Sequence, residues 1–83
     1  MKVTVFTGEH CIPCKRLKKE LDKLVEEYPE VKVELKPTED PDNLKEAQRL
    51  GIMAVPMSFV DDPQLKFAGY RSKADLIDML ELD

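Results

Sequence analysis

The sequence predicts an α/β fold, in which a four-stranded mixed β-sheet carries helices on both faces. Two observations support this prediction. Short segments rich in β-branched and aromatic residues alternate with segments whose apolar residues recur every three or four positions. The order of these segments along the chain is βαβαββα. A helical connection makes the strands that it joins parallel, whereas a short turn makes them antiparallel, so the sheet should contain both kinds of pair.

The first half of the chain is expected to form a strand–helix–strand unit. Residues 2–6 are dense in β-branched and aromatic types and predict the first strand. The helix that follows carries one apolar stripe, formed by Leu17, Leu21, Leu24, Val25 and Tyr28. Pro29 should end this helix. Residues 31–35 alternate strictly between apolar and polar side chains, which is typical of a half-buried strand.

The second helix should begin with Asp40 as its N-cap and Pro41 as its first residue, because both types are favoured at these positions. It is expected to run to about residue 50, with Gly51 as its C-cap. Its inward-facing residues should be Leu44, Ala47 and Leu50.

The last third of the chain predicts a hairpin followed by a helix. Residues 57–60 and 65–68 should be antiparallel strands joined by a turn at residues 61–64. Ser72, with Asp75 three residues later, is typical of a helix start. The final helix should pack Leu76, Ile77 and Leu80 into the core.

Length and composition limit the classes of protein to consider. The 83 residues suit one small domain, residues 1–83, and 42% of them are hydrophobic, which is enough for a core. The net charge of −4 comes from 13 basic and 17 acidic residues that are interspersed, which argues against a nucleic-acid partner. No apolar run approaches the roughly 18–20 residues of a membrane span, and the N-terminus does not resemble a signal peptide. We therefore expect a cytoplasmic monomer with no membrane partner.

Both cysteines of the chain lie in one motif, Cys11-Ile12-Pro13-Cys14, at the start of the first predicted helix. In a cytoplasmic protein, such a pair is more often catalytic or metal-binding than structural. A helix N-terminus favours negative charge, and Lys15, Arg16 and His10 add positive charge beside the motif. The pKa of Cys11 should therefore fall, which makes Cys11 the attacking thiol. Cys14, one turn deeper, should be the resolving thiol.

Two other interpretations of the cysteine pair stay open. The pair could be a structural disulfide, although a bridge that closes so short a loop adds comparatively little stability. It could also belong to a zinc or iron–sulfur site, which needs about four ligands. The motif offers two thiols with His10 beside them, so such a metal-binding module would require a dimer. For the single chain, we predict no metal and no cofactor.

Together with the strand before it and the Val55-Pro56 dipeptide far along the chain, the motif resembles the redox centre of the thioredoxin superfamily. The resemblance covers essentially the whole chain. It implies a thioredoxin-like fold, dithiol–disulfide oxidoreductase activity, and a cis-proline at Pro56 that packs against the sulfurs. It also implies that the backbone of Val55 pairs with an extended substrate segment. Ile12 and Pro13 should contribute to the same substrate-binding surface.

Within the superfamily, the size and topology are similar to the glutaredoxin-like branch. Residues 67–71 (Phe-Ala-Gly-Tyr-Arg) resemble a segment of NrdH-type redoxins, and small archaeal thioredoxin-like proteins share residues 53–56 (Met-Ala-Val-Pro). NrdH-type redoxins are reduced by thioredoxin reductase, a flavoenzyme, and pass electrons to ribonucleotide reductase. This resemblance implies that Gly69, Tyr70 and Arg71 recognise partners; alternatively, they are only part of the loop that caps the last helix.

The chain also departs from the family patterns. His10 stands where thioredoxins carry Trp, and Val5 and Phe6 occupy the region of their buried Asp. Gly69 is followed by Tyr70, whereas glutathione-dependent glutaredoxins have an acidic residue that holds glutathione. We therefore expect disulfide-containing protein substrates and a thioredoxin-reductase-type flavoenzyme as partners. A glutathione-dependent glutaredoxin is the alternative.

Overall fold

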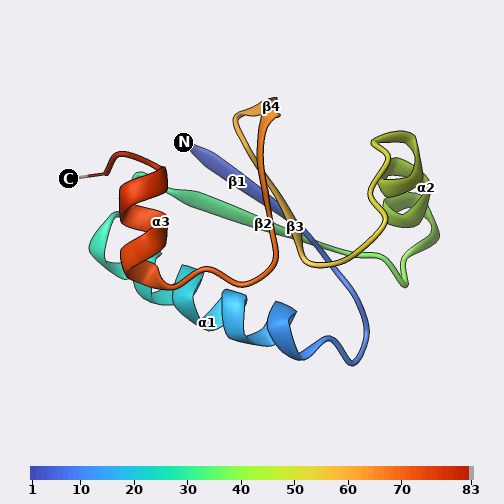
Figure 1. The fold of residues 1–83 in the computed structure, drawn as a ribbon, viewed down its shortest axis with the longest axis horizontal. Helices are drawn as coiled ribbons and strands as arrows, with labels where there is room; N and C mark the ends of the chain where they lie inside the picture. Colours follow the sequence, from blue (N-terminus) through green and yellow to red (C-terminus); the bar gives the residue numbers. More distant parts are fainter. Residues whose placement is uncertain (83) are drawn as a thin grey trace.

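The computed structural model describes residues 1–82, and for residues 62–64 it describes the backbone alone. The elements follow the order that the sequence predicts (Figure 1). They are β1 (Lys2–Thr7), α1 (Ile12–Glu27), β2 (Lys32–Pro37), α2 (Pro41–Arg49), β3 (Met57–Val60), β4 (Asp62–Ala68) and α3 (Lys73–Met79).

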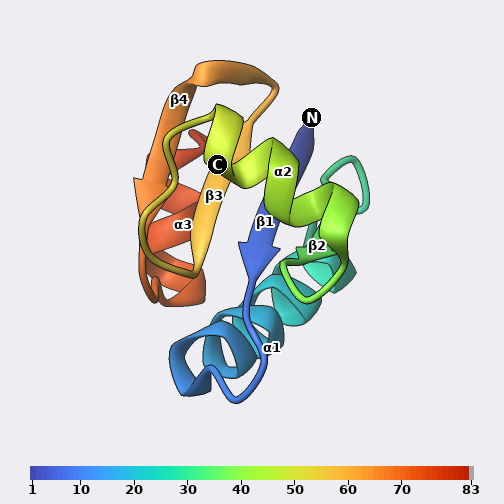
Figure 2. The ribbon, with the colours of Figure 1, turned by 90° about the vertical axis from the view of Figure 1, so that its right-hand side faces the viewer.

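The sheet is mixed, with the strand order β2-β1-β3-β4. The central strand β1 is parallel to β2 and antiparallel to β3, and β4 continues antiparallel to β3. Helices α1 and α3 lie together on one face of the sheet (Figure 1). Helix α2 stands at the end of the strands, on the side of the sheet away from α1 (Figure 1), and is therefore in front of the strands in Figure 2. The predicted α/β class, with helices on both faces, is therefore confirmed.

The main core fills the space between the sheet and the layer formed by α1 and α3. It consists of Val3, Val5, Leu17, Leu21, Leu24, Val31, Val60, Phe67, Leu76 and Leu80, all buried. Three of the stripe residues predicted for α1 are in this cluster, and the other two, Val25 and Tyr28, pack against it half-buried. Each fully buried side chain of this size contributes about 1.5–3 kcal/mol to folding. This packing fixes the position of α1 on the sheet.

The N-termini of α2 and α3 follow the predicted capping residues. The Asp40 carboxylate accepts a hydrogen bond from the backbone N–H of Asp42 at 2.9 Å. The Ser72 hydroxyl accepts one from the backbone N–H of Asp75 at 3.2 Å. The C-cap of α2 is Leu50 and not Gly51, which follows it with φ +75°, a conformation that glycine adopts without steric cost. Each side-chain cap stabilises its helix by about 1 kcal/mol.

Helix α3 is also fixed to α1 by polar contacts. The backbone N–H of Lys73 donates to Glu20 Oε1 at 2.8 Å, and the Lys73 ammonium forms an ion pair with Glu27. The backbone hydrogen bond lowers the pKa of Glu20, and the hydrogen bond to Glu27 raises the pKa of Lys73. These contacts fix the first turn of α3, and with it the segment that precedes Ser72.

Two further local predictions are wrong. Leu44 and Leu50 of α2 were expected to face inward, yet they are 44% and 41% exposed, and Ala47 alone is buried among the three. The reason is that α2 lies at the end of the sheet beside β2 and covers little of it. The turn expected at residues 61–64 is also shorter. Strand β4 begins at Asp62, which pairs with Val60, and the chain reverses at Asp61 with φ 44°.

Within residues 1–82, none of the helices has the length and apolar composition that a membrane crossing requires.

The core contains one buried hydroxyl that lacks a partner. Ser58 of β3 is fully buried, and it pairs with Val5 across the sheet. Its Oγ has no hydrogen-bond partner among the described residues. A buried hydroxyl without a partner destabilises the folded state by about 1–3 kcal/mol.

We therefore expect Ser58→Ala to raise the free energy of unfolding by about 1 kcal/mol, because alanine removes the desolvated hydroxyl at the cost of a small void. Urea denaturation followed by circular dichroism measures this change. Ser72→Ala is the matched control, and it should lower the free energy of unfolding by about 1 kcal/mol because it removes the cap of α3. A Ser58→Ala protein that is no more stable than the parent would contradict the prediction.

Candidate active site

Cys11 and Cys14 are joined by a disulfide across the first turn of α1, with their Cα atoms 5.2 Å apart. The two residues differ in accessibility. Cys11 is half-buried, whereas Cys14 is only 5% exposed and faces the interior. A reagent that approaches from solvent therefore reaches the Cys11 sulfur first.

The N-terminus of α1 places a backbone hydrogen-bond donor on the outer sulfur. Cys11 is the N-cap residue, and its Sγ accepts a hydrogen bond from the backbone N–H of Cys14 at 3.2 Å. Pro13 lies in the first turn, where its missing N–H removes no helical hydrogen bond. After reduction of the disulfide, the same N–H and the helix dipole stabilise negative charge on Cys11 Sγ.

A distant segment of the chain lies against this sulfur. The Val55–Pro56 peptide bond is cis, as the family resemblance implied. The Val55 carbonyl oxygen is 3.9 Å from Cys11 Sγ, and Pro56 is buried. The backbone N–H of Gly69 donates to the Pro56 carbonyl at 2.9 Å. The structure thus brings together Cys11, Cys14, Val55, Pro56 and Gly69, all of which the sequence analysis singled out.

Gly8 lies between the cysteine motif and this segment, and the sequence analysis did not identify it. A Cβ at this position would lie 2.9 Å from Val55 Cγ2 and 3.9 Å from Cys11 Cβ. The first distance is shorter than real Cβ contacts allow, so a side chain at Gly8 would displace the side chain of Val55. No local pattern signals this close approach, because Val55 lies far along the chain from Gly8.

The two residues predicted to modulate Cys11 both face solvent. His10 has φ 58°, and its exposed imidazole lies 3.5 Å from the Glu9 carboxylate. The Lys15 backbone N–H donates to the Cys11 carbonyl at 3.2 Å, and its side chain is exposed. Lys15 therefore contributes positive charge to the surface beside the disulfide.

The segment after β4 reaches α1 through an aromatic contact. The Arg16 guanidinium lies over the Tyr70 ring, 4.9 Å from its centroid. The Arg71 guanidinium donates to the Tyr70 carbonyl at 3.0 Å and lies 5.9 Å from the centroid of the Phe67 ring. Neither Tyr70 nor Arg71 caps α3, because the Ser72 hydroxyl does so. Arg16 was predicted only as a positive charge near Cys11, and its contact with Tyr70 was not predicted.

Apolar side chains are exposed in the segments that carry Cys11, Val55 and Gly69. Ile12, between the cysteines, is 68% exposed, and Met53, two residues before Val55, is 96% exposed. Tyr70 is also exposed, whereas Met57 is half-buried. Exposed residues of this kind are typical of surfaces that contact other proteins.

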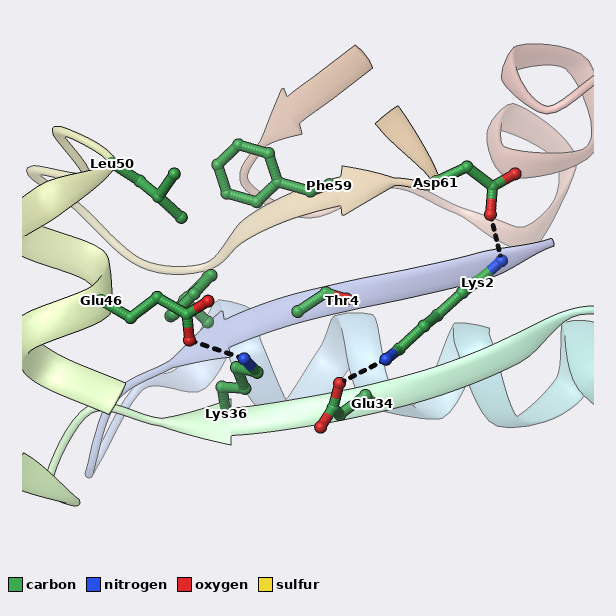
Figure 3. A pocket seen from close by; sticks show the side chains of 9 residues that line it. Lys2, Thr4, Glu34, Lys36, Glu46, Leu50, Phe59 and Asp61 are labelled. Carbon is green, nitrogen blue, oxygen red and sulfur yellow. Dashed lines mark hydrogen bonds and ion pairs between the residues drawn. The ribbon is translucent and has the colours of Figure 1, made fainter. Parts of the chain in front are cut away.

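A groove of about 450 Å³ lies on the sheet face opposite α1 and α3 (Figure 3). Its lining residues are Lys2, Thr4, Phe6, Glu34, Lys36, Glu46, Leu50, Phe59 and Asp61. Lys36 Nζ is 2.6 Å from Glu46 Oε1, and Lys2 Nζ is 2.9 Å from Glu34 Oε1. The first contact raises the pKa of Lys36, and the second lowers the pKa of Glu34. None of the site residues predicted from the sequence lines this groove.

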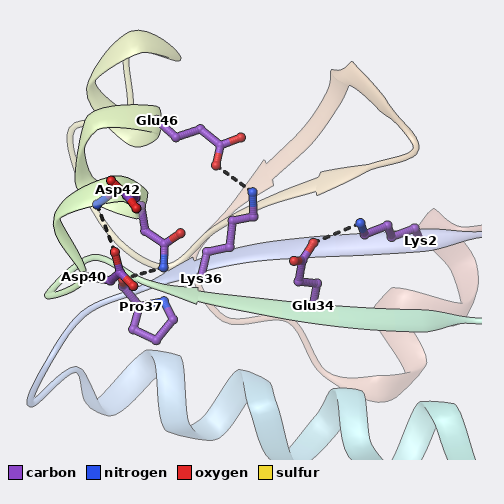
Figure 4. Close-up of polar contacts among 8 residues, drawn as sticks. Lys2, Glu34, Lys36, Pro37, Asp40, Asp42 and Glu46 are labelled. Atoms are coloured by element: carbon purple, nitrogen blue, oxygen red, sulfur yellow. Dashed lines mark hydrogen bonds and ion pairs between the residues drawn. The ribbon is translucent and has the colours of Figure 1, made fainter.

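The polar groups at one end of the groove attach α2 to β2 (Figure 4). Besides the pair of Lys36 and Glu46, the Asn43 amide donates to the Pro37 carbonyl at 2.9 Å. These contacts compensate for the small apolar area that α2 buries. We therefore interpret the charged groups at this end of the groove as structural.

Comparison with known proteins agrees with this geometry. The family model described as a thioredoxin domain matches residues 1–81. The chain belongs to the thioredoxin-domain family. No curated protein sequence matches this thioredoxin-domain protein significantly.

Solved structures show the same fold. Chloroplastic thioredoxin z is 23% identical, with a TM-score of 0.80, and the alignment covers 98% of this chain and 75% of that one. Thioredoxin 1 from Thermosipho africanus is 19% identical, with a TM-score of 0.75, and the alignment covers 99% of this chain and 92% of that one. Desulfothioredoxin from Desulfovibrio vulgaris Hildenborough is 23% identical, with a TM-score of 0.78, and the alignment covers 99% of this chain and 80% of that one. Family membership and the Cys11–Cys14 disulfide together support thiol–disulfide oxidoreductase activity.

Gly8→Ala should slow disulfide reduction between about 10- and 100-fold, because the new Cβ separates Val55 from Cys11 and shifts the reacting sulfur. The measurement is the rate of insulin reduction with dithiothreitol as electron donor. Gly51→Ala is the control, since a side chain at φ +75° costs about 1 kcal/mol of stability at a site away from the disulfide. Its rate should equal that of the parent. A folded Gly8→Ala protein with the parental rate would show that this approach is unimportant.

Proposed function

We propose that this thioredoxin-domain protein is a dithiol–disulfide carrier that reduces disulfides of other proteins. The observation that carries the proposal is the arrangement of the two sulfurs. One lies at the accessible N-terminus of α1 with a backbone donor on it, and the other is buried directly behind it. A purely structural disulfide needs neither the difference in exposure nor the exposed apolar residues around it.

The reaction consists of two thiol–disulfide exchanges. The Cys11 thiolate attacks one sulfur of the substrate disulfide, a mixed disulfide forms, and the other substrate sulfur leaves as a thiolate. Cys14, after losing its proton, then attacks Cys11 Sγ and displaces the second substrate thiolate. The Cys11–Cys14 disulfide forms, and the substrate has gained two electrons. A second partner must return two electrons to the protein before the next cycle.

The surface around Cys11 supports binding of an extended substrate segment. We assign the backbone of Val55 as the pairing site, since its carbonyl lies beside the reacting sulfur. Ile12, Pro13 and Tyr70 provide exposed apolar contacts. Gly69 and Pro56 shape this surface through their mutual hydrogen bond, and Arg71 holds the carbonyl of Tyr70.

We further propose that the protein belongs to the glutaredoxin-like branch, close to NrdH-type redoxins. The support is the short chain and the Gly69-Tyr70-Arg71 segment. A thioredoxin-reductase-type flavoenzyme would then be its reductant in the cytoplasm, and ribonucleotide reductase a substrate. The absence of an acidic residue directly after Gly69 favours this reductant over glutathione.

A coupled assay distinguishes the two reductants. Insulin reduction is followed as NADPH consumption, either with purified thioredoxin reductase or with glutathione and glutathione reductase. We expect turnover in the first system and little in the second. Turnover with glutathione alone would instead identify a glutaredoxin.

Metal analysis and absorption spectra after anaerobic purification test for a metal- or cluster-binding dimer, which would show bound iron or zinc.

Cys14→Ser should trap the mixed disulfide, because the variant retains the attacking thiol and lacks the resolving thiol. The trapped species is detected by non-reducing electrophoresis and mass spectrometry after incubation with a disulfide-containing protein, and dithiothreitol should release it. Cys11→Ser is the control and should trap less. Sustained turnover by the Cys14→Ser protein, or preferential trapping by Cys11→Ser, would contradict the assigned roles.

A further inference from the structure

The charges of α1 are arranged against the helix dipole. A helix is stabilised by acidic residues in its first turn and basic residues in its last turn. The first turn of α1 has no acidic residue, and its last turn has no basic residue. Instead, the half that begins at the disulfide carries Lys15, Arg16, Lys18 and Lys19, and the helix ends with Glu26 and Glu27.

The other helices of the chain have the acidic first turn that α1 lacks. Helix α2 has Asp42 in its first turn and Arg49 in its last, and α3 has Asp75 in its first turn, although its last turn has no basic residue. The whole chain has a net charge of −4, so an acidic first turn for α1 would also match its composition. Helix stability therefore does not explain the basic residues beside the disulfide.

Three of these cations are available to a partner. Lys18 is paired with Asp22 at 2.9 Å. In the part of the chain that the structure describes, Lys15, Arg16 and Lys19 have no ion pair, and we call these three residues the basic face. Near the motif, Glu9 lies beside the exposed imidazole of His10.

The basic face continues directly from the exposed side chain of Ile12. Residues spaced by three, four and seven positions lie on one side of a helix, and Lys15, Arg16 and Lys19 have this spacing from Ile12. Arg16 is held in place by its stacking on Tyr70. Seven residues of helix span about 10 Å, which is about three residues of an extended peptide. A substrate segment bound at Cys11 would place its next few side chains over these cations.

We propose that the basic face binds acidic side chains that flank the substrate disulfide, so that the protein prefers acidic protein segments. This inference rests on the proposed function, since it describes the partner of the same disulfide. Complementary charge raises the rate of encounter, and salt screens the effect. The preference should therefore appear in the second-order rate constant and fade at high ionic strength.

The test uses three synthetic disulfide-linked peptides that are identical except for the residues flanking the cysteine, which are Glu, Gln or Lys. Stopped-flow measurement gives the second-order rate constant for their reduction by the reduced protein. At an ionic strength of about 10 mM, where screening acts over about 30 Å, the Glu peptide should react about tenfold faster than the Gln peptide, and the Lys peptide more slowly. At about 1 M, where screening acts over about 3 Å, the three rates should converge.

Lys15→Glu combined with Lys19→Glu tests the residues themselves. In this variant the ratio of the rate constants for the Glu and Gln peptides should fall at least tenfold, whatever common change the loss of Lys15 makes to the reactivity of Cys11 with all three peptides. Its fold should persist, because Lys15 and Lys19 are exposed and lie outside the buried stripe of α1. The control is Lys32→Glu with Lys66→Glu, which makes the same change in net charge at exposed positions away from α1 and should leave the preference unchanged.

The outcomes separate the inference from the proposed function. An equal decrease for all three peptides in the Lys15/Lys19 variant would show that the cations act only on the Cys11 thiolate, and would overturn the inference. Equal rates for all three peptides with the parent protein would also overturn it, with the proposed function intact. If the parent protein reduces none of the peptides, the proposed function itself fails.

Discussion

The register between β1 and β3 is the constraint on which the site depends. The two strands are antiparallel, and Phe6 pairs with Met57. The end of β1 therefore lies beside the start of β3. The loop that leads from β1 to Cys11 and the Val55–Pro56 segment that leads into β3 consequently meet at the same end of these two inner strands. A slip of one residue would turn Ser58 and Val60 out of the core and move Val55 away from the sulfur.

Helix α1 combines two requirements that act on different sides of it. Its apolar stripe is buried against the sheet and holds the helix in place. Its N-terminus and its outward-facing residues determine the chemistry at Cys11. Because the stripe fixes the helix along its length, the first turn can carry charges that do not favour helix formation. The contacts of Tyr70 with Arg16, and of Lys73 with Glu20, then join the C-terminal segment to the same helix.

The sequence predicted the features that depend on local pattern. The element order, the stripe of α1, the N-capping residues and the cysteine motif all follow from the types and spacing of nearby residues. The features that it did not predict depend on tertiary placement. The exposure of Leu44 and Leu50 arises because α2 reaches only the end of the sheet. The close approach of Val55 to Gly8 and the stacking of Arg16 on Tyr70 are contacts between segments about 50 residues apart, which no local pattern encodes.

The disulfide joins residues only three positions apart, and this has a thermodynamic consequence. A bridge between distant residues is favoured mainly because it limits the entropy of the unfolded chain, so its oxidation is strongly coupled to folding. A bridge within one helical turn gains less from this source. By linkage, the balance between dithiol and disulfide is therefore governed more by the groups that touch the sulfur, such as the Cys14 N–H, than by the stability of the domain. Substitutions elsewhere in the core can then change the free energy of unfolding more than they change the equilibrium between the dithiol and the disulfide.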